Sequence, residues 1–311
     1  MHIASYGRWT LALGLLAACG GSSTPPAEYP PIDEPEPETR PEPEQEPLAQ
    51  PEPPPPPPPV QVVAAEHTPI EGPPPAVRIL SPRANQRFAR APVSLRVALT
   101  NWTLGPDPGN HIHVIVDDLP YIAVRDVRRP IDLVALLREH LDHELAPGSH
   151  VVRVFASRPH HESVKSPGAF AAVAFVYQRP TEGFSFDPRA PLLTYSRPKG
   201  CVPAGERVLL DFFVTGTTLA ADGARVRYTI GSLASGELTS WQPHYIENLP
   251  VGEHTIRLTL VGADGQPIAG PFNDTTRTIT VAERCPEATP AHAQGAHGTA
   301  TSPATSTTPS P

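Results

Sequence analysis

The feature that most constrains this chain is an internal repeat. Residues 81–118 align with residues 196–232, and residues 145–157 align with residues 249–261. Both copies contain short runs in which apolar and polar residues alternate, such as VSLRVAL and ERVLLDFFV, with Gly, Pro and Asp turns between them. Such alternation is typical of half-buried antiparallel strands. The sequence therefore predicts an all-β chain with two tandem immunoglobulin-like β-sandwich domains.

Low-complexity sequence bounds the two domains on either side. Residues 19–76 alternate Pro with Glu and then run through unbroken prolines, and residues 286–311 are rich in Ala, Thr and Ser. Such segments favour an extended, solvated backbone and cannot build a core. We therefore expect a disordered tether at 19–76, domains at 77–179 and 183–285, and a disordered tail at 286–311.

The net charge is confined to the tether. The chain carries a formal charge of −8, and between residues 24 and 60 nine acidic residues accompany one base, Arg40, which gives the same value. The rest of the chain is therefore balanced. A basic surface for nucleic acid is not indicated, so we expect no nucleic-acid partner.

The N-terminus indicates export. Residues 1–18 have a weakly basic start at Arg8 and an apolar run too short to span a bilayer, as in a signal peptide. The motif LAAC, ending at Cys19, resembles the lipobox of bacterial lipoproteins, which implies cleavage before Cys19 and its acylation with chains such as palmitate. Two or more acyl chains give a lasting membrane anchor. In that family an aspartate directly after the lipidated cysteine commonly retains the protein at the inner membrane. Gly20 stands at this position, which implies the outer membrane and leaves the leaflet open.

The other two cysteines are Cys201 and Cys285. They form an even pair in an oxidising compartment, so we expect a disulfide between them. In the chain-entropy model a loop of this length stabilises the fold by roughly 4 to 5 kcal/mol.

One segment of the first domain departs from the strand pattern. In residues 131–145, Asp132 is placed to cap a short helix that carries Val134, Leu137 and Leu141 on one face. We expect a helical insertion here.

The repeat also sorts the histidines. His150 and His254 occupy equivalent places at the start of a strand, so we interpret both as architectural, with a hydrogen bond to a loop carbonyl. His111 and His113 align with arginines in the second copy. This pair therefore belongs to the first domain alone.

His111 and His113 are expected to lie near the loop at residues 158–165. In an antiparallel sandwich the strand that begins at His111 starts beside the end of the strand that runs into this loop. His150 lies at the other end of that second strand. The separation we expect is on the order of 10 Å between Cβ atoms. The candidate ligand-binding residues are His111, His113, Arg158, His160, His161, Glu162 and Lys165.

Three interpretations of this cluster stay open. Imidazole and carboxylate suit zinc or copper, with His111, His113 and His160 as metal ligands. The same Arg, Lys and His donors could hold an anion or a sugar-like ligand. Alternatively the loop is ordered by its own salt bridges. Apart from such a metal ion, we expect no cofactor.

Enzyme motifs fail on context. The stretch HHESVK has Lys165 where a zinc-protease helix needs its second histidine, and SRPK at 196–199 contains Pro198, which disfavours the helix that a Ser-x-x-Lys nucleophile requires. We therefore expect no enzymatic activity.

The segments GNHIHVIVDDLPYIAV and PGSHVVRVFASRPHHESVKSPGAFAAVAF, together with the lipobox, resemble a group of bacterial envelope lipoproteins with immunoglobulin-like modules. The resemblance implies a fold and a location, and it brings no catalytic residues. The sequence thus predicts a lipid-anchored binding or scaffold protein of the cell envelope, with a protein or glycan partner. A periplasmic metal-handling protein is the alternative.

Overall fold

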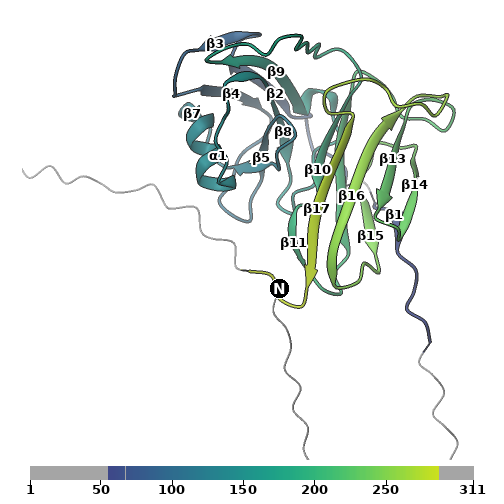
Figure 1. Ribbon diagram of the computed structural model, residues 1–311. Helices are drawn as coiled ribbons and strands as arrows, with labels where there is room; N and C mark the ends of the chain where they lie inside the picture. The colour runs from purple at the N-terminus through teal and green to yellow at the C-terminus, as the bar shows by residue number, and fades with distance from the viewer. Residues whose placement is uncertain (1–54, 67, 287–311) are drawn as a thin grey trace, which may run out of the picture. The chain divides into compact units, whose positions relative to one another are not determined.

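Both copies of the repeat fold into β-sandwiches (Figure 1). In this computed structural model, residues 55–66 and 68–286 are described. The expected signal peptide, the lipidation site Cys19 and residues 287–311 of the tail lie outside the described residues. The architecture confirms the predicted all-β class with two tandem immunoglobulin-like sandwiches and one short helix.

The first sandwich combines a three-stranded with a five-stranded sheet. The smaller sheet has the strand order β2 (Ala76–Ser81), β4 (Ser94–Thr100) and β7 (Ile131–Asp132). The larger sheet has the order β3 (Gln86–Phe88), β9 (Phe170–Tyr177), β8 (Gly148–Ser157), β5 (His111–Val116) and β6 (Ile122–Val124). A short 3-10 turn, η1 (Pro167–Ala169), precedes β9.

The second sandwich repeats this arrangement. One sheet has the order β1 (Gln61–Ala64), β15 (His244–Glu247), β12 (Val208–Thr215) and β10 (Leu192–Arg197). The other has the order β11 (Gly200–Pro203), β17 (Asp274–Ala282), β16 (Gly252–Val261), β13 (Arg225–Ile230) and β14 (Ala234–Leu238). In both sandwiches the last strand pairs in parallel with a short strand, β9 with β3 and β17 with β11. The other pairings between the named strands are antiparallel.

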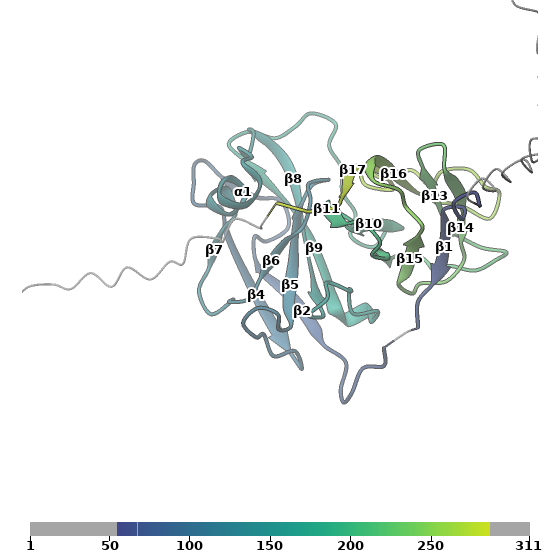
Figure 2. The same cartoon turned by 90° about the horizontal axis from the view of Figure 1, so that it is seen from below.

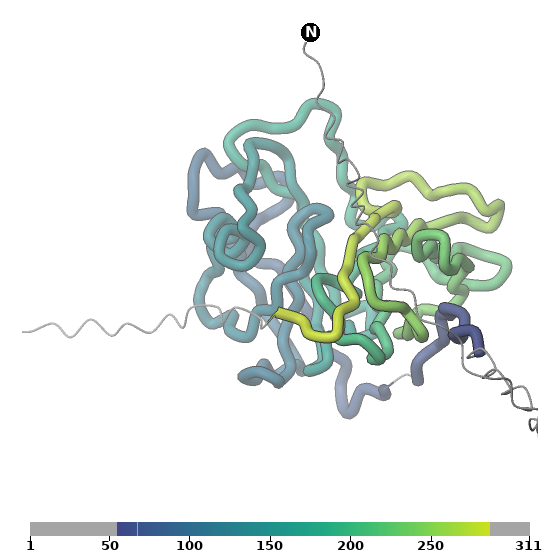
Figure 3. The backbone as a smooth tube through the Cα atoms, turned by 60° about the horizontal axis from the view of Figure 1, so that its bottom comes forward, coloured from purple at the N-terminus to yellow at the C-terminus, as the bar shows by residue number. Residues whose placement is uncertain are grey.

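Strand β1 corrects the expected extent of the tether. Residues 61–64 pair antiparallel with β15, although the sequence interpretation placed them in disordered chain. The unbroken run of prolines ends at Pro59, and Val62 packs against the core of the second sandwich while the backbone covers an otherwise open sheet edge. Figure 2 shows β1 beside β15. The trace in Figure 3 runs from this purple segment through the first sandwich and returns to the green and yellow second sandwich.

The expected helical insertion is present as α1 (Leu133–Leu141). The carboxylate of Asp132 caps it by accepting from the backbone N–H of Val134 at 3.1 Å, and it also accepts from the N–H of Val93 at 3.0 Å. Leu137 on its inner face is buried in the core of the first sandwich. No helix in the described part of the chain is long and apolar enough to cross a membrane.

His150 and His254 have the architectural role that the repeat predicted. His150 Nε2 donates to the carbonyl of Ala146 at 2.8 Å, and His254 Nε2 donates to the carbonyl of Pro250 at 2.7 Å. Each histidine thus bonds to a carbonyl four residues earlier and closes the loop between them. Nδ1 of His150 also lies 2.7 Å from the carboxylate of Asp117.

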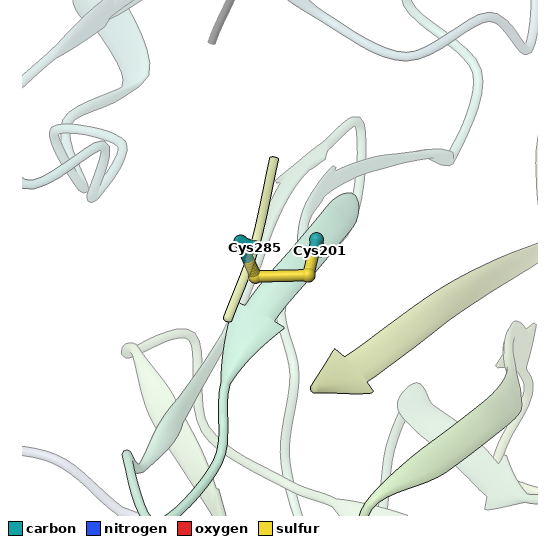
Figure 4. Close-up of a disulfide and its surroundings, with 2 residues drawn as sticks. All are labelled: Cys201 and Cys285. Atoms are coloured by element: carbon teal, nitrogen blue, oxygen red, sulfur yellow. A yellow bond between two sulfur atoms is a disulfide. The ribbon is translucent and has the colours of Figure 1, made fainter. Parts of the chain in front are cut away.

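A disulfide joins Cys201 and Cys285, with the two Cα atoms 5.5 Å apart (Figure 4). Cys201 lies in β11, and Cys285 follows the parallel neighbour of that strand, β17. The bond therefore secures the end of the last strand to the sheet edge.

A buried contact joins the two sandwiches, and both belong to one compact unit. The rings of Phe155 and Phe170 in the first sandwich pack against Phe213 in β12, with centroids 5.7 and 4.9 Å apart. The buried Arg153 of β8 donates to the hydroxyl of Thr194 in β10 at 3.1 Å. As a result, all six residues of β5 are buried, including those on the face that points away from its own sandwich.

A buried ion pair also crosses this contact. Lys165 Nζ donates to Asp211 Oδ1 at 2.6 Å, to the carbonyl of Phe212 at 2.6 Å and to the hydroxyl of Ser163 at 2.8 Å. The side chains of Lys165 and Asp211 are 2% and 0% exposed. The ammonium group thus has three acceptors, as a buried cation requires.

Replacing Asp211 by alanine is expected to lower the free energy of unfolding by about 3 to 5 kcal/mol, because the Lys165 ammonium then stays buried without its counter-charge. Urea denaturation measures this loss. The double variant Lys165→Met, Asp211→Leu should lose less than the single one. The control is Glu144→Ala, which breaks the exposed pair with Arg138 and should cost much less, because solvent screens this pair. Equal losses in both single variants would contradict a stabilising role for the buried pair.

Candidate functional site

Three histidines converge at one edge of the contact between the sandwiches. His111 Nε2 lies 3.1 Å from His113 Nε2 and 2.9 Å from His161 Nδ1, and the last two atoms are 3.3 Å apart. We call His111, His113 and His161 the histidine trio. The sequence correctly predicted that the strand pair meets the loop at 158–165.

The backbone explains how the trio forms. In the pairing of β5 with β8, His111 lies opposite Ser157, the last residue of β8, so the loop begins beside it. A tight turn follows, in which the N–H of His161 donates to the carbonyl of Arg158 at 2.9 Å. His161 has a φ of 68°, which is uncommon for a residue with a side chain. This turn directs its ring toward β5.

The second sandwich covers the strand histidines of the trio. His111 and His113 are 0% exposed. Strand alternation places them on the face of β5 opposite Ile112 and Val114, which belong to the core of the first sandwich. The hydroxyl of Ser196 in β10 lies 3.2 Å from His113 Nδ1.

The Nε2 atoms of His111 and His113 face inward and their Nδ1 atoms face outward. His111 Nδ1 lies 3.1 Å from the carbonyl of Gly109, which can only accept, and 3.2 Å from Arg125 Nη1, which can only donate. His113 Nδ1 faces the hydroxyl of Ser196, which can do either. With protons on those outer nitrogens, the inward nitrogen atoms of both rings carry lone pairs. The centre of the trio is then a cluster of acceptors.

The surroundings keep the trio neutral. Burial holds the pKa of His113 well below its usual range, and the other two histidines, Lys199 and Arg197 lower it further. Burial lowers the pKa of His161 to about 3, and the neighbouring Arg197, His111 and Lys199 contribute to this shift. Burial also lowers the pKa of His111, against the Gly109 carbonyl, which raises it. Neutral imidazole is the form that binds metal ions.

Tyr121 and the segment after β10 complete the wall of the site. The ring of Tyr121 stacks on the ring of His113 with centroids 3.6 Å apart. Lys199 Nζ lies 3.9 Å from the centroid of the Tyr121 ring. Lys199 also donates to the carbonyl of Tyr121 at 2.7 Å. Ser196 and Lys199 belong to the SRPK stretch, which we had considered only as an enzyme motif. The end of strand β10 and the irregular residues after it carry this stretch, not a helix.

The remaining candidate residues are engaged elsewhere. His160 Nε2 lies 2.8 Å from Glu162 Oε2, so His160, which we had predicted as a metal ligand, points away from the trio and His161 takes its place. Arg158 donates to the carbonyl of Thr68 at 2.6 Å. Lys165 is held by Asp211. Local turn geometry decides between adjacent histidines, and the residue pattern does not show it.

His160 and Glu162 instead line a cavity of about 400 Å³. Arg207 and Tyr245 of the second sandwich lie on its other side, with the guanidinium carbon 4.2 Å from the tyrosine ring centroid. His160 has a side chain that is 52% exposed. A polar ligand at this cavity would meet imidazole, guanidinium and carboxylate groups.

No family model matches the chain, and no curated protein matches it. Among solved structures, it is similar to one described as "Structures of Clostridium thermocellum CbhA fibronectin(III)-like modules", with 14% sequence identity and a TM-score of 0.24. The match covers 66% of this chain and 93% of that one. The strand order described above therefore carries the fold assignment.

Acid is expected to destabilise the metal-free protein. Because the pKa values of the trio are lowered on folding, the unfolded chain takes up protons below about pH 6.5 that the folded chain does not. The free energy of unfolding should then fall by about 1.4 kcal/mol per pH unit for each such proton. For His161 this loss continues down to about pH 3. Urea titrations at several pH values in a chelator measure the slope.

Two variants test the assignment of that slope. His161→Gln should make it shallower. His150→Gln should leave the slope below about pH 6.5 unchanged: burial lowers the pKa of His150 but Asp117 outweighs that effect and raises it, so its stabilisation is fully present below about pH 6.5 and is lost only at higher pH. An acid slope that His161→Gln leaves unchanged would contradict the assignment.

Proposed function

We propose that this chain is a lipid-anchored protein of the bacterial outer membrane that presents two joined sandwiches as a binding or scaffold unit. The buried contact between the sandwiches is the observation that carries the proposal. Its ion pair and aromatic packing make the two domains a single presenting surface. The lipobox at Cys19 supports the anchor, and the Pro/Glu-rich segment supports a display away from the membrane.

The shortened tether still gives a long reach. It runs from Cys19 to Val60, because β1 belongs to the second sandwich. At about 3.1 Å per residue, a polyproline II chain of that length reaches roughly 130 Å. The glutamates repel one another and favour the extended state. A partner in the envelope, protein or glycan, would thus be met well away from the anchoring leaflet.

The cavity beside His160 is the best-supported place for such a partner. There the predicted ligand-binding residues His160 and Glu162 of the first domain lie beside Arg207 and Tyr245 of the second sandwich. The metal-handling alternative suits the molecule less well, because uptake and release of a metal ion need access and both strand histidines of the trio are buried.

Replacing Cys19 by alanine is expected to move the protein from the membrane pellet to the soluble fraction, since the acylated residue is removed. Fractionation with immunoblotting measures this. The control is Gly20→Asp, which keeps the cysteine and should stay with membranes; by the lipoprotein resemblance it should shift from the outer to the inner membrane. Unchanged sedimentation of the Cys19 variant would refute the anchor.

A photo-crosslinking amino acid at position 160 is expected to form an adduct with an envelope component in living cells, because this position borders the cavity. Mass spectrometry identifies the adduct. The control position is Val251, which is 57% exposed on the second sandwich. Equal yields at both positions would contradict a specific surface at the cavity.

A further inference from the structure

Three ring nitrogens of the trio converge on one point. His111 Nε2, His113 Nε2 and His161 Nδ1 lie 2.9 to 3.3 Å from one another. Each ring has a second nitrogen that can carry its proton, and for His111 and His113 this nitrogen faces the Gly109 carbonyl and the Ser196 hydroxyl. With the protons there, three lone pairs face one point, which is the arrangement that a bound metal ion requires.

We infer that the histidine trio binds a transition-metal ion, Zn²⁺ or Cu²⁺, at the contact between the two sandwiches. The three nitrogen–nitrogen distances are 2.9, 3.1 and 3.3 Å. Around tetrahedral zinc with bonds of about 2.0 to 2.1 Å, nitrogen ligands lie roughly 3.3 Å apart. The trio therefore forms one face of such a tetrahedron after small side-chain shifts.

The donor set selects the class of metal. Three imidazole nitrogens suit zinc, copper or nickel, whereas magnesium and calcium require oxygen ligands. Among the described residues, no cysteine or carboxylate belongs to this group of three histidines. At equal availability the order of affinities puts copper above zinc, so the two ions are tested separately.

The outer contacts match those of metal-bound histidines. Such rings commonly donate their second N–H to a carbonyl or another oxygen, which fixes the tautomer and the ring orientation. The Gly109 carbonyl has this position for His111, and the Ser196 hydroxyl has it for His113. Because Ser196 belongs to β10, a bound ion would link the second sandwich to ligands of the first.

The charges around the trio define the fourth ligand. Arg125, Arg197 and Lys199 act on the trio as positive charges, and Asp107, which pairs with Arg125, acts as a negative one. A divalent ion adds charge of the same sign as the majority. An anion in the fourth position, hydroxide or chloride, offsets part of it. Because His111 and His113 are buried, we assign the ion a structural role.

The test uses the purified full chain, freed of metal with a chelator and titrated calorimetrically with Zn²⁺ and, separately, with Cu²⁺. We expect saturable binding and a higher melting temperature with at least one ion. His161→Gln should weaken that binding by at least ~10-fold and abolish the increase in melting temperature. Its ring is the least buried of the three, so this variant is the one best suited to fold.

The matched control is His160→Gln, which removes the neighbouring histidine that pairs with Glu162 and should leave the high-affinity site intact. Histidines elsewhere add weak binding to both variants equally. Ser196→Ala should weaken binding by roughly 10- to 100-fold while retaining all three ligands. Circular dichroism checks the fold of each variant. Equal binding by the His160 and His161 variants, or no saturable binding of either ion by the unmodified chain, would overturn the inference.

Discussion

Burial of strand β5 on both faces is the constraint on which the candidate site depends. Its inward side chains, Ile112, Val114 and Val116, belong to the core of the first sandwich, and its outward histidines lie under the second. Removing imidazole from water favours its neutral form. The same cover thus creates the ligand-competent state of the rings and requires that their polar atoms find partners inside the protein.

The contact that provides this cover is itself rich in polar groups. Arg153, Lys165 and Asp211 are buried there, and each has hydrogen-bond partners contributed by the opposite sandwich. A sliding or rotated contact of equal area would leave these charges unpaired at a cost of several kcal/mol. We therefore attribute the single arrangement of the sandwiches to these groups, and the larger share of the stabilisation to the aromatic and aliphatic side chains around Phe213.

Much of the fold could be predicted because strand alternation and turn residues are local signals. The repeat, the cap at Asp132 and the carbonyl partners of His150 and His254 all depend on residues close in sequence. Strand alternation also implies that residues 111–116 have two faces. It could not show whether the second face meets water or another domain, since a histidine-bearing face is compatible with either.

The site itself was predictable only in part for the same reason. That His111 and His113 meet the loop follows from antiparallel pairing, but the choice of His161 over His160 depends on a left-handed turn of one residue. The contribution of Ser196 depends on how two domains dock. The sequence did not predict strand β1, because QVVA is only four residues long and directly follows a proline-rich segment.

Strand β1 determines how mechanical load enters the molecule. A pull on the N-terminal segment acts along β1, parallel to the strand and across its hydrogen bonds to β15, so the whole row of bonds between Gln61 and Ala64 would have to shear together. The force then passes into the second sandwich, although the first sandwich comes next in the sequence. The loop that carries His161 and the short link after β1 lie beyond this clamp, so tension in the tether acts on the second sandwich before it reaches the first.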